Sequence, residues 1–287
     1  MRVWLISGCS SGFGHQLALE ALARGDKVIA TARNSSRLSS LKSAGAEIME
    51  LDLTSTASDI TEFASKVISI HGQIDVLVNN AGTAVLGAVE ELQTDDWDTI
   101  FKTNFFGHVY LTKALLPHMR ERKSGTIGFI SSVGAWVVFP GLAAYNATKA
   151  ALSIYAETLA AEIAPLGVKI CTIEPGYFRT SMPDNTQIVD SIDAYDAGAV
   201  GQVRRMVAGM QGKQPGDLVK GSRAIVDVLA GMGGREVPTR FVLGNDAMAL
   251  VKARVDTVTK GMEEWEDVAG NTDVDGAADI NAMPSHA

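Results

Sequence analysis

The segment Val3-Trp4-Leu5-Ile6-Ser7-Gly8-Cys9-Ser10-Ser11-Gly12-Phe13-Gly14 decides the fold. Residues 3–6 form a short apolar run typical of a buried strand, the glycines predict a turn, and residues 15–20 begin a helix with apolar periodicity. Such a turn places backbone N–H groups against an anionic pyrophosphate, and glycine permits the close approach. The spacing G-x-x-x-G-x-G differs from the general dinucleotide pattern, so a plain strand–helix turn is the alternative interpretation.

The composition predicts a globular protein with a large core, because 46% of the 287 residues are hydrophobic and 20% are charged. We expect no membrane span and no signal peptide, since no apolar run is long enough and the first strand begins at residue 3. Cys9 and Cys171 fit a reducing compartment, which favours a cytoplasmic location, and they form no metal site. We expect Cys9 to be a small residue that fills space in the buried core rather than a reactive thiol.

The net charge of −8 is unevenly spread along the chain. Residues 261–287 contain seven acidic side chains and no Lys or Arg, so the rest of the chain carries 25 basic and 26 acidic groups. This nearly neutral body argues against a nucleic-acid partner. We expect one catalytic domain over residues 1–250, followed at 251–287 by a C-terminal helix and a loosely ordered acidic tail.

Alternating strand and helix patterns predict the fold class. Further apolar runs lie at 27–31, 46–51, 74–78, 126–130, 168–173 and 240–243, and helical spacing appears between them at 60–70, 98–120 and 143–164. The alternation predicts an α/β protein with a Rossmann-like, doubly wound parallel sheet of about seven strands and helices on both faces. Ligands of such sheets bind at the carboxyl ends of the strands, so the site is expected there.

Three strand ends carry groups suited to an adenine dinucleotide. The second strand ends in Arg33 without the acidic residue typical of NAD sites, and its guanidinium suits a 2′-phosphate, so NADP(H) is preferred and NAD(H) is possible. A solvated loop charge is the alternative. Asp52, followed by Leu53, is a candidate contact to the adenine or a helix N-terminal acid. The turn Asn79-Asn80-Ala81-Gly82 can approach a cofactor or brace the strands.

A candidate proton-transfer site follows the fifth predicted strand. Ser132 stands at the strand end, Tyr145 comes thirteen residues later, and Lys149 is four residues further on, which places the last two on one helix face. A nearby ammonium lowers the pKa of a tyrosine from its reference of about 10. An ordinary amphipathic helix would explain the pair alone, but the accompanying serine and glycine turn favour a catalytic site.

These motifs together resemble the classical short-chain dehydrogenase/reductase family, of the NADP-preferring type similar to hydroxysteroid and retinol dehydrogenases and carbonyl reductases. The resemblance covers the chain to about residue 180 and on toward residue 250. It rests on residues 7–14 and 79–82, on Ser132, Tyr145 and Lys149, and on Pro175-Gly176 with Thr180. The family usually has Thr where this chain has Ser7, and both residues carry a hydroxyl.

The resemblance implies a role for each matching residue. Tyr145 would exchange the proton of the substrate oxygen, Ser132 would hydrogen-bond that oxygen, and Lys149 would hold the nicotinamide ribose and lower the tyrosine pKa. Asn104 would support a water-linked proton path; a mid-helix polar residue is the alternative. The implied cofactor-binding residues are Ser7, Gly8, Ser10, Ser11, Gly12, Phe13, Gly14, Arg33, Asp52, Leu53, Asn80, Ala81, Gly82, Tyr145, Lys149, Pro175, Gly176 and Thr180.

The substrate is expected to be an apolar ketone, aldehyde or alcohol beneath a lid at residues 177–218. Its predicted contacts are Ser132, Trp136, Val138, Tyr145, Phe178 and Met182, with plain packing as the alternative. The resemblance also implies a homodimer or homotetramer that pairs through residues 103–120 and 143–164. An epimerase or lyase of the same fold, and a nucleotide-sensing module without turnover, are the other functions considered.

Overall fold

The computed structural model describes residues 1–182, 186–210, 212–270 and 272–274. Its main sheet has seven parallel strands in the order β3-β2-β1-β4-β6-β7-β9. The strands are β1 (Val3–Ile6), β2 (Lys27–Ala32), β3 (Glu47–Glu50), β4 (Val76–Asn79), β6 (Gly125–Ile130), β7 (Val168–Pro175) and β9 (Arg240–Leu243). The predicted Rossmann-like sheet of seven strands is confirmed, and the ends of the predicted strands differ from these by one or two residues.

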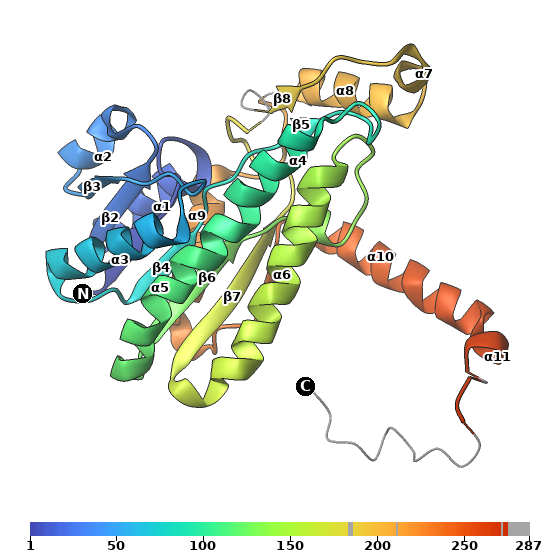
Figure 1. Cartoon of the computed structure of the whole chain (residues 1–287). Helices are drawn as coiled ribbons and strands as arrows, with labels where there is room; N and C mark the ends of the chain where they lie inside the picture. The colour runs from blue at the N-terminus through green and yellow to red at the C-terminus, as the bar shows by residue number, and fades with distance from the viewer. Residues whose placement is uncertain (183–185, 211, 271, 275–287) are drawn as a thin grey trace.

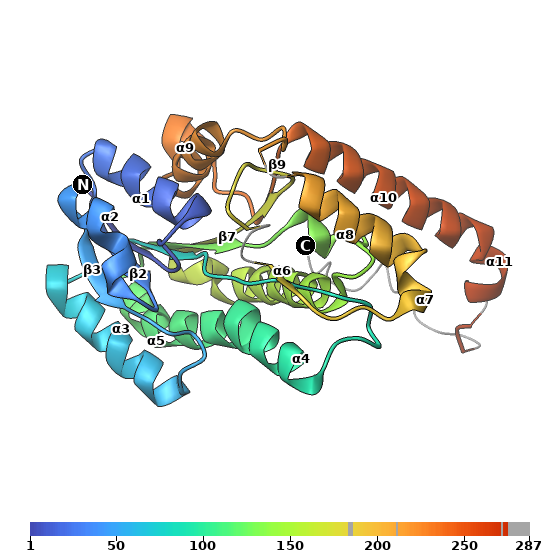
Figure 2. The ribbon, with the colours of Figure 1, turned by 90° about the horizontal axis from the view of Figure 1, so that it is seen from above.

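Helices cover both faces of the sheet (Figure 2). One layer contains α1 (Gly12–Ala23), α2 (Ser39–Ser43) and α9 (Leu218–Leu229), and the other contains α3 (Ala57–His71), α5 (Gly107–Arg122) and α6 (Ala143–Ile163). The two-residue period of β1 divides its side chains between the layers: Val3 and Leu5 pack against the α3–α5–α6 side, and Trp4 and Ile6 against the α1–α9 side. Both faces of β1 are therefore buried, which explains its unbroken apolar sequence.

The chain order of the strands reverses next to β1, whose neighbours in the sheet are β2 and β4. Because all strands are parallel, the loops after β1, β2, β4 and β6 emerge at the same edge of the sheet. This reversal is the topological switch point at which doubly wound sheets bind ligands. The motifs predicted to bind and react lie along this edge.

The predicted single helix over 98–120 is divided in the structure. Helix α4 (Thr94–Phe101) continues through a π-helical turn (Lys102–Phe106) into α5. The π turn contains Asn104, which is buried and bonded to main-chain atoms outside the helix. A local widening of the helix at a functional position is a known use of π turns, and periodicity alone does not reveal it.

The segment predicted as a lid stands over one end of the sheet (Figure 1). It contains β8 (Gln187–Ile188), which pairs with β5 (Val85–Leu86), and the helices α7 (Asp193–Asp196) and α8 (Ala199–Met210). An ion pair fixes α8 to the body: the fully buried carboxylate of Glu91 accepts from Arg204 at 2.6 Å. Residues 183–185, beside Met182, lie outside the described residues.

The C-terminal part of the chain forms α10 (Asn245–Glu264) and α11 (Glu266–Ala269), and α10 extends away from the sheet (Figure 1). The predicted boundary at residue 250 falls inside α10, because the helix already begins where β9 ends. Most of the predicted acidic tail, residues 275–287, lies outside the described residues. In the part of the chain that the structure describes, no helix is long and apolar enough to span a membrane.

Candidate active site

Ser7 and Asn80 join the two central loops of the site. The Ser7 hydroxyl accepts hydrogen bonds from the backbone N–H groups of Asn80 (2.9 Å) and Ala81 (3.0 Å). In return, the Asn80 side-chain amide donates to the carbonyl oxygens of Ser7 (2.7 Å) and Gly8 (3.1 Å). Asn80 therefore braces the glycine turn, and its expected contact with a cofactor stays a prediction.

The glycines of the first turn have different reasons to be glycine. A Cβ on Gly8 would lie 2.7 Å from the Cα of Ala81, and one on Gly14 would lie 2.5 Å from the carbonyl oxygen of Gly8. Because Gly8 and Gly14 have no side chain, the glycine turn can pack closely on itself and against the loop after β4. Gly12 has φ +58°, and Thr180 is the only described residue that a Cβ there would meet, at 3.7 Å. Gly12 supplies the left-handed backbone, and a Cβ there would make only an ordinary van der Waals contact with Thr180.

The start of α1 fits the pyrophosphate of a dinucleotide. Within the described residues, α1 has neither a side-chain cap nor an acidic residue in its first turn, so its positive end is left for an anion. The backbone N–H of Cys9 donates to the carbonyl of Thr31 at 2.8 Å, which holds this turn beside the end of β2, where Arg33 is exposed. The residues present therefore suit a phosphate-bearing cofactor.

Two other residues near the turn are occupied by local interactions. Asp52 accepts from the backbone N–H (2.9 Å) and hydroxyl (2.8 Å) of Thr54 through one carboxylate oxygen. Cys9 is completely buried, and burial raises the pKa of its thiol to about 12. A buried thiol of this kind is inert, so the filler interpretation of Cys9 is confirmed.

Ser132, Tyr145 and Lys149 come together at the carboxyl end of β6, as the sequence predicts. Ser132 follows the strand and accepts from the backbone N–H of Gly134 at 3.0 Å, while the hydroxyl of Tyr145 on α6 is hydrogen-bonded to Ser132. Lys149 lies one turn further along α6, with its Nζ 5.7 Å from the centroid of the tyrosine ring. That Nζ donates to the carbonyl oxygen of Ile130 at 2.8 Å.

The electrostatics of this group correct one expectation. Burial raises the pKa of Tyr145 above its ordinary value, and the hydrogen bond from Ser132 offsets only part of that rise. The predicted lowering of the tyrosine pKa by Lys149 is wrong for this structure: burial and the Ser132 hydrogen bond set the direction of the Tyr145 shift, while the Lys149 ammonium donates to the main-chain carbonyl of Ile130 and burial lowers its own pKa to about 8. Tyr145 is therefore held as a neutral phenol, ready to donate a proton.

The depressed pKa of Lys149 gives an expected pH dependence of stability. Below pH 8 the folded protein holds a buried ammonium; between pH 8 and the reference value of 10.5 the folded state has released a proton that the unfolded state still binds. The free energy of unfolding of the wild type should therefore rise with pH across this window, by about 3 kcal/mol relative to Lys149→Met. Urea unfolding at several pH values measures this difference.

Lys113→Met, at an exposed position on α5, is the matched control for that experiment. It should follow the wild-type pH profile. Parallel profiles for Lys149→Met and the wild type would show that Lys149 is not held in a desolvated site.

Asn104 is fixed by the loop after β4. Its side-chain oxygen accepts from the backbone N–H of Thr83, and its amide donates to the Thr83 carbonyl, both at 2.9 Å. The same amide also donates to the Thr148 hydroxyl on α6 at 3.2 Å. A Cβ on Gly82 would lie 3.4 Å from the Asn104 oxygen and 3.6 Å from Lys149 Nζ, so Gly82 separates the two groups. The proposed water-linked path remains a prediction.

His108 was missed by the sequence reasoning. It is completely buried, and its two ring nitrogens lie 2.8 Å from the Ala81 carbonyl oxygen and 3.2 Å from the Asn79 side-chain oxygen. Burial, with a further contribution from Lys149, lowers the pKa of His108 to about 3, so the imidazole is neutral. The sequence feature that could have pointed to His108 is its position four residues after Asn104, on the same helix face.

Glu174 is a second residue that the sequence reasoning missed, and it supports the loop that carries Ser132. The fully buried carboxylate of Glu174 accepts from the Ser153 hydroxyl (3.0 Å), the Trp136 indole (2.7 Å) and Arg240 Nε (2.9 Å). Ser153 is bonded in turn to the hydroxyl of Ser131, the residue before Ser132, at 2.8 Å. These contacts join β7, β9 and α6 to the loop that carries Ser132.

The predicted substrate contacts fall into two groups. Trp136 is stacked under the Arg240 guanidinium at 3.9 Å, and Phe178 is buried against Phe13 with ring centroids 5.1 Å apart. Both rings pack against protein partners, and their expected contact with a substrate stays a prediction. Val138 and Met182 are 77% and 38% exposed and remain available.

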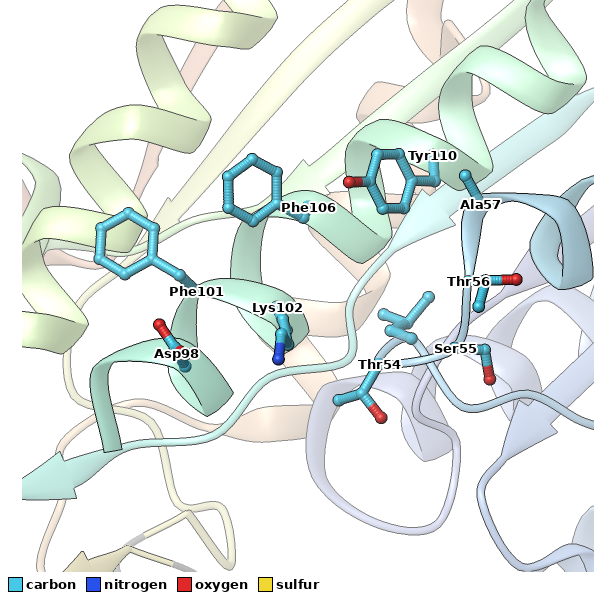
Figure 3. A pocket seen from close by; sticks show the side chains of 10 residues that line it. Thr54, Ser55, Thr56, Ala57, Asp98, Phe101, Lys102, Phe106 and Tyr110 are labelled. Atoms are coloured by element: carbon cyan, nitrogen blue, oxygen red, sulfur yellow. The ribbon is translucent and has the colours of Figure 1, made fainter. Parts of the chain in front are cut away.

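A hollow of about 370 Å³ lies elsewhere, between the start of α3 and the α4–α5 junction (Figure 3). Its lining includes Thr56, Lys102, Phe106 and Tyr110. Of the candidate site residues, Leu53 alone contributes to the described lining, so this hollow is separate from the Ser132–Tyr145–Lys149 group.

The fold and this group define a nucleotide-dependent α/β oxidoreductase, and the comparisons agree. The family model of the short chain dehydrogenases matches residues 2–188. The chain is 34% identical to Oxidoreductase BOA17 of Botryotinia fuckeliana over 274 residues, covering 93% of this chain and 98% of that protein. It therefore belongs to the short-chain dehydrogenase/reductase family.

Two solved structures extend the comparison. A short-chain dehydrogenase from Streptomyces avermitilis has a TM-score of 0.87 and 41% identity, covering 95% of this chain and 99% of that one. The closed form of a serine dehydrogenase complexed with NADP⁺ has a TM-score of 0.71 and 28% identity, covering 84% of this chain and 94% of that one.

Proposed function

We propose that this protein is an NADP(H)-dependent oxidoreductase that interconverts a ketone or aldehyde and an alcohol on a small apolar substrate. The observation that carries the proposal is the convergence of Ser132, Tyr145 and Lys149 at the carboxyl edge of the sheet, beside the uncapped start of α1. The nicotinamide supplies the hydride when it is bound, and the chain's own residues handle the proton.

In the reducing direction, the neutral phenol of Tyr145 donates its proton to the substrate oxygen, and in oxidation the phenolate accepts it. Ser132 donates a hydrogen bond to the same oxygen as negative charge develops there. Lys149 holds a positive charge close to the phenolate that each turnover forms, and the fixed amide of Asn104 supports proton return from solvent. The raised pKa of Tyr145 favours the protonated form near neutral pH.

Arg33 is the proposed determinant of the NADP(H) preference. Arg33→Asp should lower kcat/KM for NADPH relative to NADH by about a hundredfold, because a charge-assisted contact is lost and a repulsive one replaces it. Arg37→Asp, an equal charge change at another exposed position a few residues away, is the matched control. A larger effect from Arg37→Asp would place the phosphate on that residue instead.

The substrate class rests on the exposed apolar side chains near the site. Val138 and Met182 are joined by Phe139 and Tyr177, whose rings meet edge to face at 6.0 Å. Such a lining favours apolar carbonyl compounds. NADPH consumption across apolar ketones, aldehydes and steroid-like carbonyls tests the proposal, and turnover confined to charged or highly polar compounds would contradict it.

We further infer that the enzyme forms a homodimer or homotetramer through α5 and α6. Apolar side chains are exposed at this surface: Phe106, at the start of α5, is 41% exposed, and Ile154 on α6 is 61% exposed. Aromatic residues of this kind are typical anchors of protein interfaces.

A further inference from the structure

Helix α10 carries an unpartnered apolar face that the proposed reaction does not use. Large apolar residues recur at positions 248, 251, 255, 258 and 262 of α10 and at position 265 directly after it, spaced alternately by three and four residues as in the seam of a coiled coil. We call these six residues the α10 stripe. Met248, Val255, Val258, Met262 and Trp265 are 42–63% exposed, and Val251 is half-buried.

The helix itself is poorly supported by its local sequence. Val255, Thr257, Val258 and Thr259 are β-branched, and Gly261 follows, all of which lower helix propensity. Among the described residues of α10, only Ala247 is buried, so the body of the protein contributes little packing beyond the first turn. An isolated helix of this length is marginal in water, and a packing partner would supply the missing stability.

The charges along α10 indicate how that partner lies. The first half of α10, residues 245–254, carries Asp246, Lys252 and Arg254, a net charge of +1, and the second half, residues 255–264, carries Asp256, Lys260, Glu263 and Glu264, a net charge of −2. Glu266 and Asp267 follow in α11, so acidic groups gather at the end of the helix, where they oppose its dipole. Two parallel helices would place these acidic ends side by side. Two antiparallel helices place each acidic end against the basic half of the other.

We propose that the α10 stripe packs antiparallel against the stripe of a second copy of this chain. Lys252 directly follows Val251 within α10, and Glu266 directly follows Trp265 at the start of α11, so an antiparallel pair brings Lys252 of one copy toward the acidic end of the other. This interface is separate from the α5–α6 surface, and together the two would build a larger assembly than either alone.

The first test compares Val258→Glu, within the stripe, with Thr257→Glu on the adjacent, outward-facing position. Both add one charge at an exposed β-branched residue far from Ser132 and Tyr145, so turnover should be retained. Val258→Glu buries an unpaired carboxylate in the proposed interface and should weaken self-association by at least about a hundredfold. Light scattering should then show half the wild-type molar mass for Val258→Glu and the full wild-type molar mass for Thr257→Glu.

Equal masses for the wild type and Val258→Glu would overturn the proposal, as would equal losses in both variants. If the wild type has the same mass as Val258→Glu but sediments with phosphatidylcholine–phosphatidylglycerol vesicles, the stripe is a membrane-binding face and the proposal is wrong. Halving of the mass occurs whether or not α5 and α6 also pair, so the result does not depend on that surface.

The second test addresses the antiparallel order. Lys252→Glu and Glu266→Lys should each weaken association, measured by sedimentation equilibrium, because each places like charges opposite one another. The double variant restores opposite charges and should recover most of the wild-type affinity. A double variant that is no better than the single ones would overturn the antiparallel arrangement.

Discussion

Tyr145→Phe should fold, bind NADPH and lose turnover by about 10²–10⁴-fold. The substitution removes only the hydroxyl that is hydrogen-bonded to Ser132 and leaves the buried ring in place on α6. No other phenol is hydrogen-bonded to Ser132 in the described part of the chain, so the proton has no alternative donor in that position. Steady-state NADPH oxidation with an accepted carbonyl substrate measures the loss.

NADPH binding by fluorescence is the control for this variant, and its Kd should change far less than turnover, because Tyr145 is only one of the proposed cofactor contacts and the others are left in place. Ser132→Ala provides a comparison that removes a hydrogen bond to the substrate oxygen but keeps the proton donor. Turnover of Tyr145→Phe near the wild-type rate would exclude Tyr145 as the general acid.

Arg240→Met should lower the free energy of unfolding by about 3–5 kcal/mol, because it leaves the carboxylate of Glu174 buried without its cation. Glu174 has no exposed side-chain surface, and Arg240 is the cationic partner that the described residues give it. Since Trp136 and Ser153 share the same carboxylate, the loss should also loosen the loop that carries Ser132. Urea unfolding measures the first effect and kcat the second.

Arg223→Met is the matched control for this experiment, because Arg223 pairs with Glu20 at 3.4 Å and is 60% exposed. Exposed ion pairs contribute about 0–1 kcal/mol, so the same substitution there should have little effect. Adding Glu174→Gln to Arg240→Met should recover part of the lost stability by removing the unpaired charge. Equal effects of Arg240→Met and Arg223→Met would show that the Glu174 pair is not a desolvated one.

Strand positions were predictable because a parallel sheet covered on both faces leaves unbroken apolar runs, as in Val3–Ile6. The division of the helix around Asn104 was not, since the Asn104 side chain is bonded to Thr83, a residue of another loop, and helical periodicity does not reveal such a contact. The same holds for Trp136. Its sequence position just before Tyr145 suggests a substrate contact, which stays a prediction, and the sequence does not reveal its partners Glu174 and Arg240, which come from β7 and β9.

By itself the sequence determined the doubly wound sheet, the glycine turn and the spacing that unites Ser132, Tyr145 and Lys149, because periodicity and motif spacing are local properties of a chain. Only the tertiary structure decided the protonation of the site. Burial raises the pKa of Tyr145, lowers that of Lys149 to about 8 and keeps His108 neutral. Desolvation depends on what surrounds a group in space, and residues distant in sequence supply those surroundings.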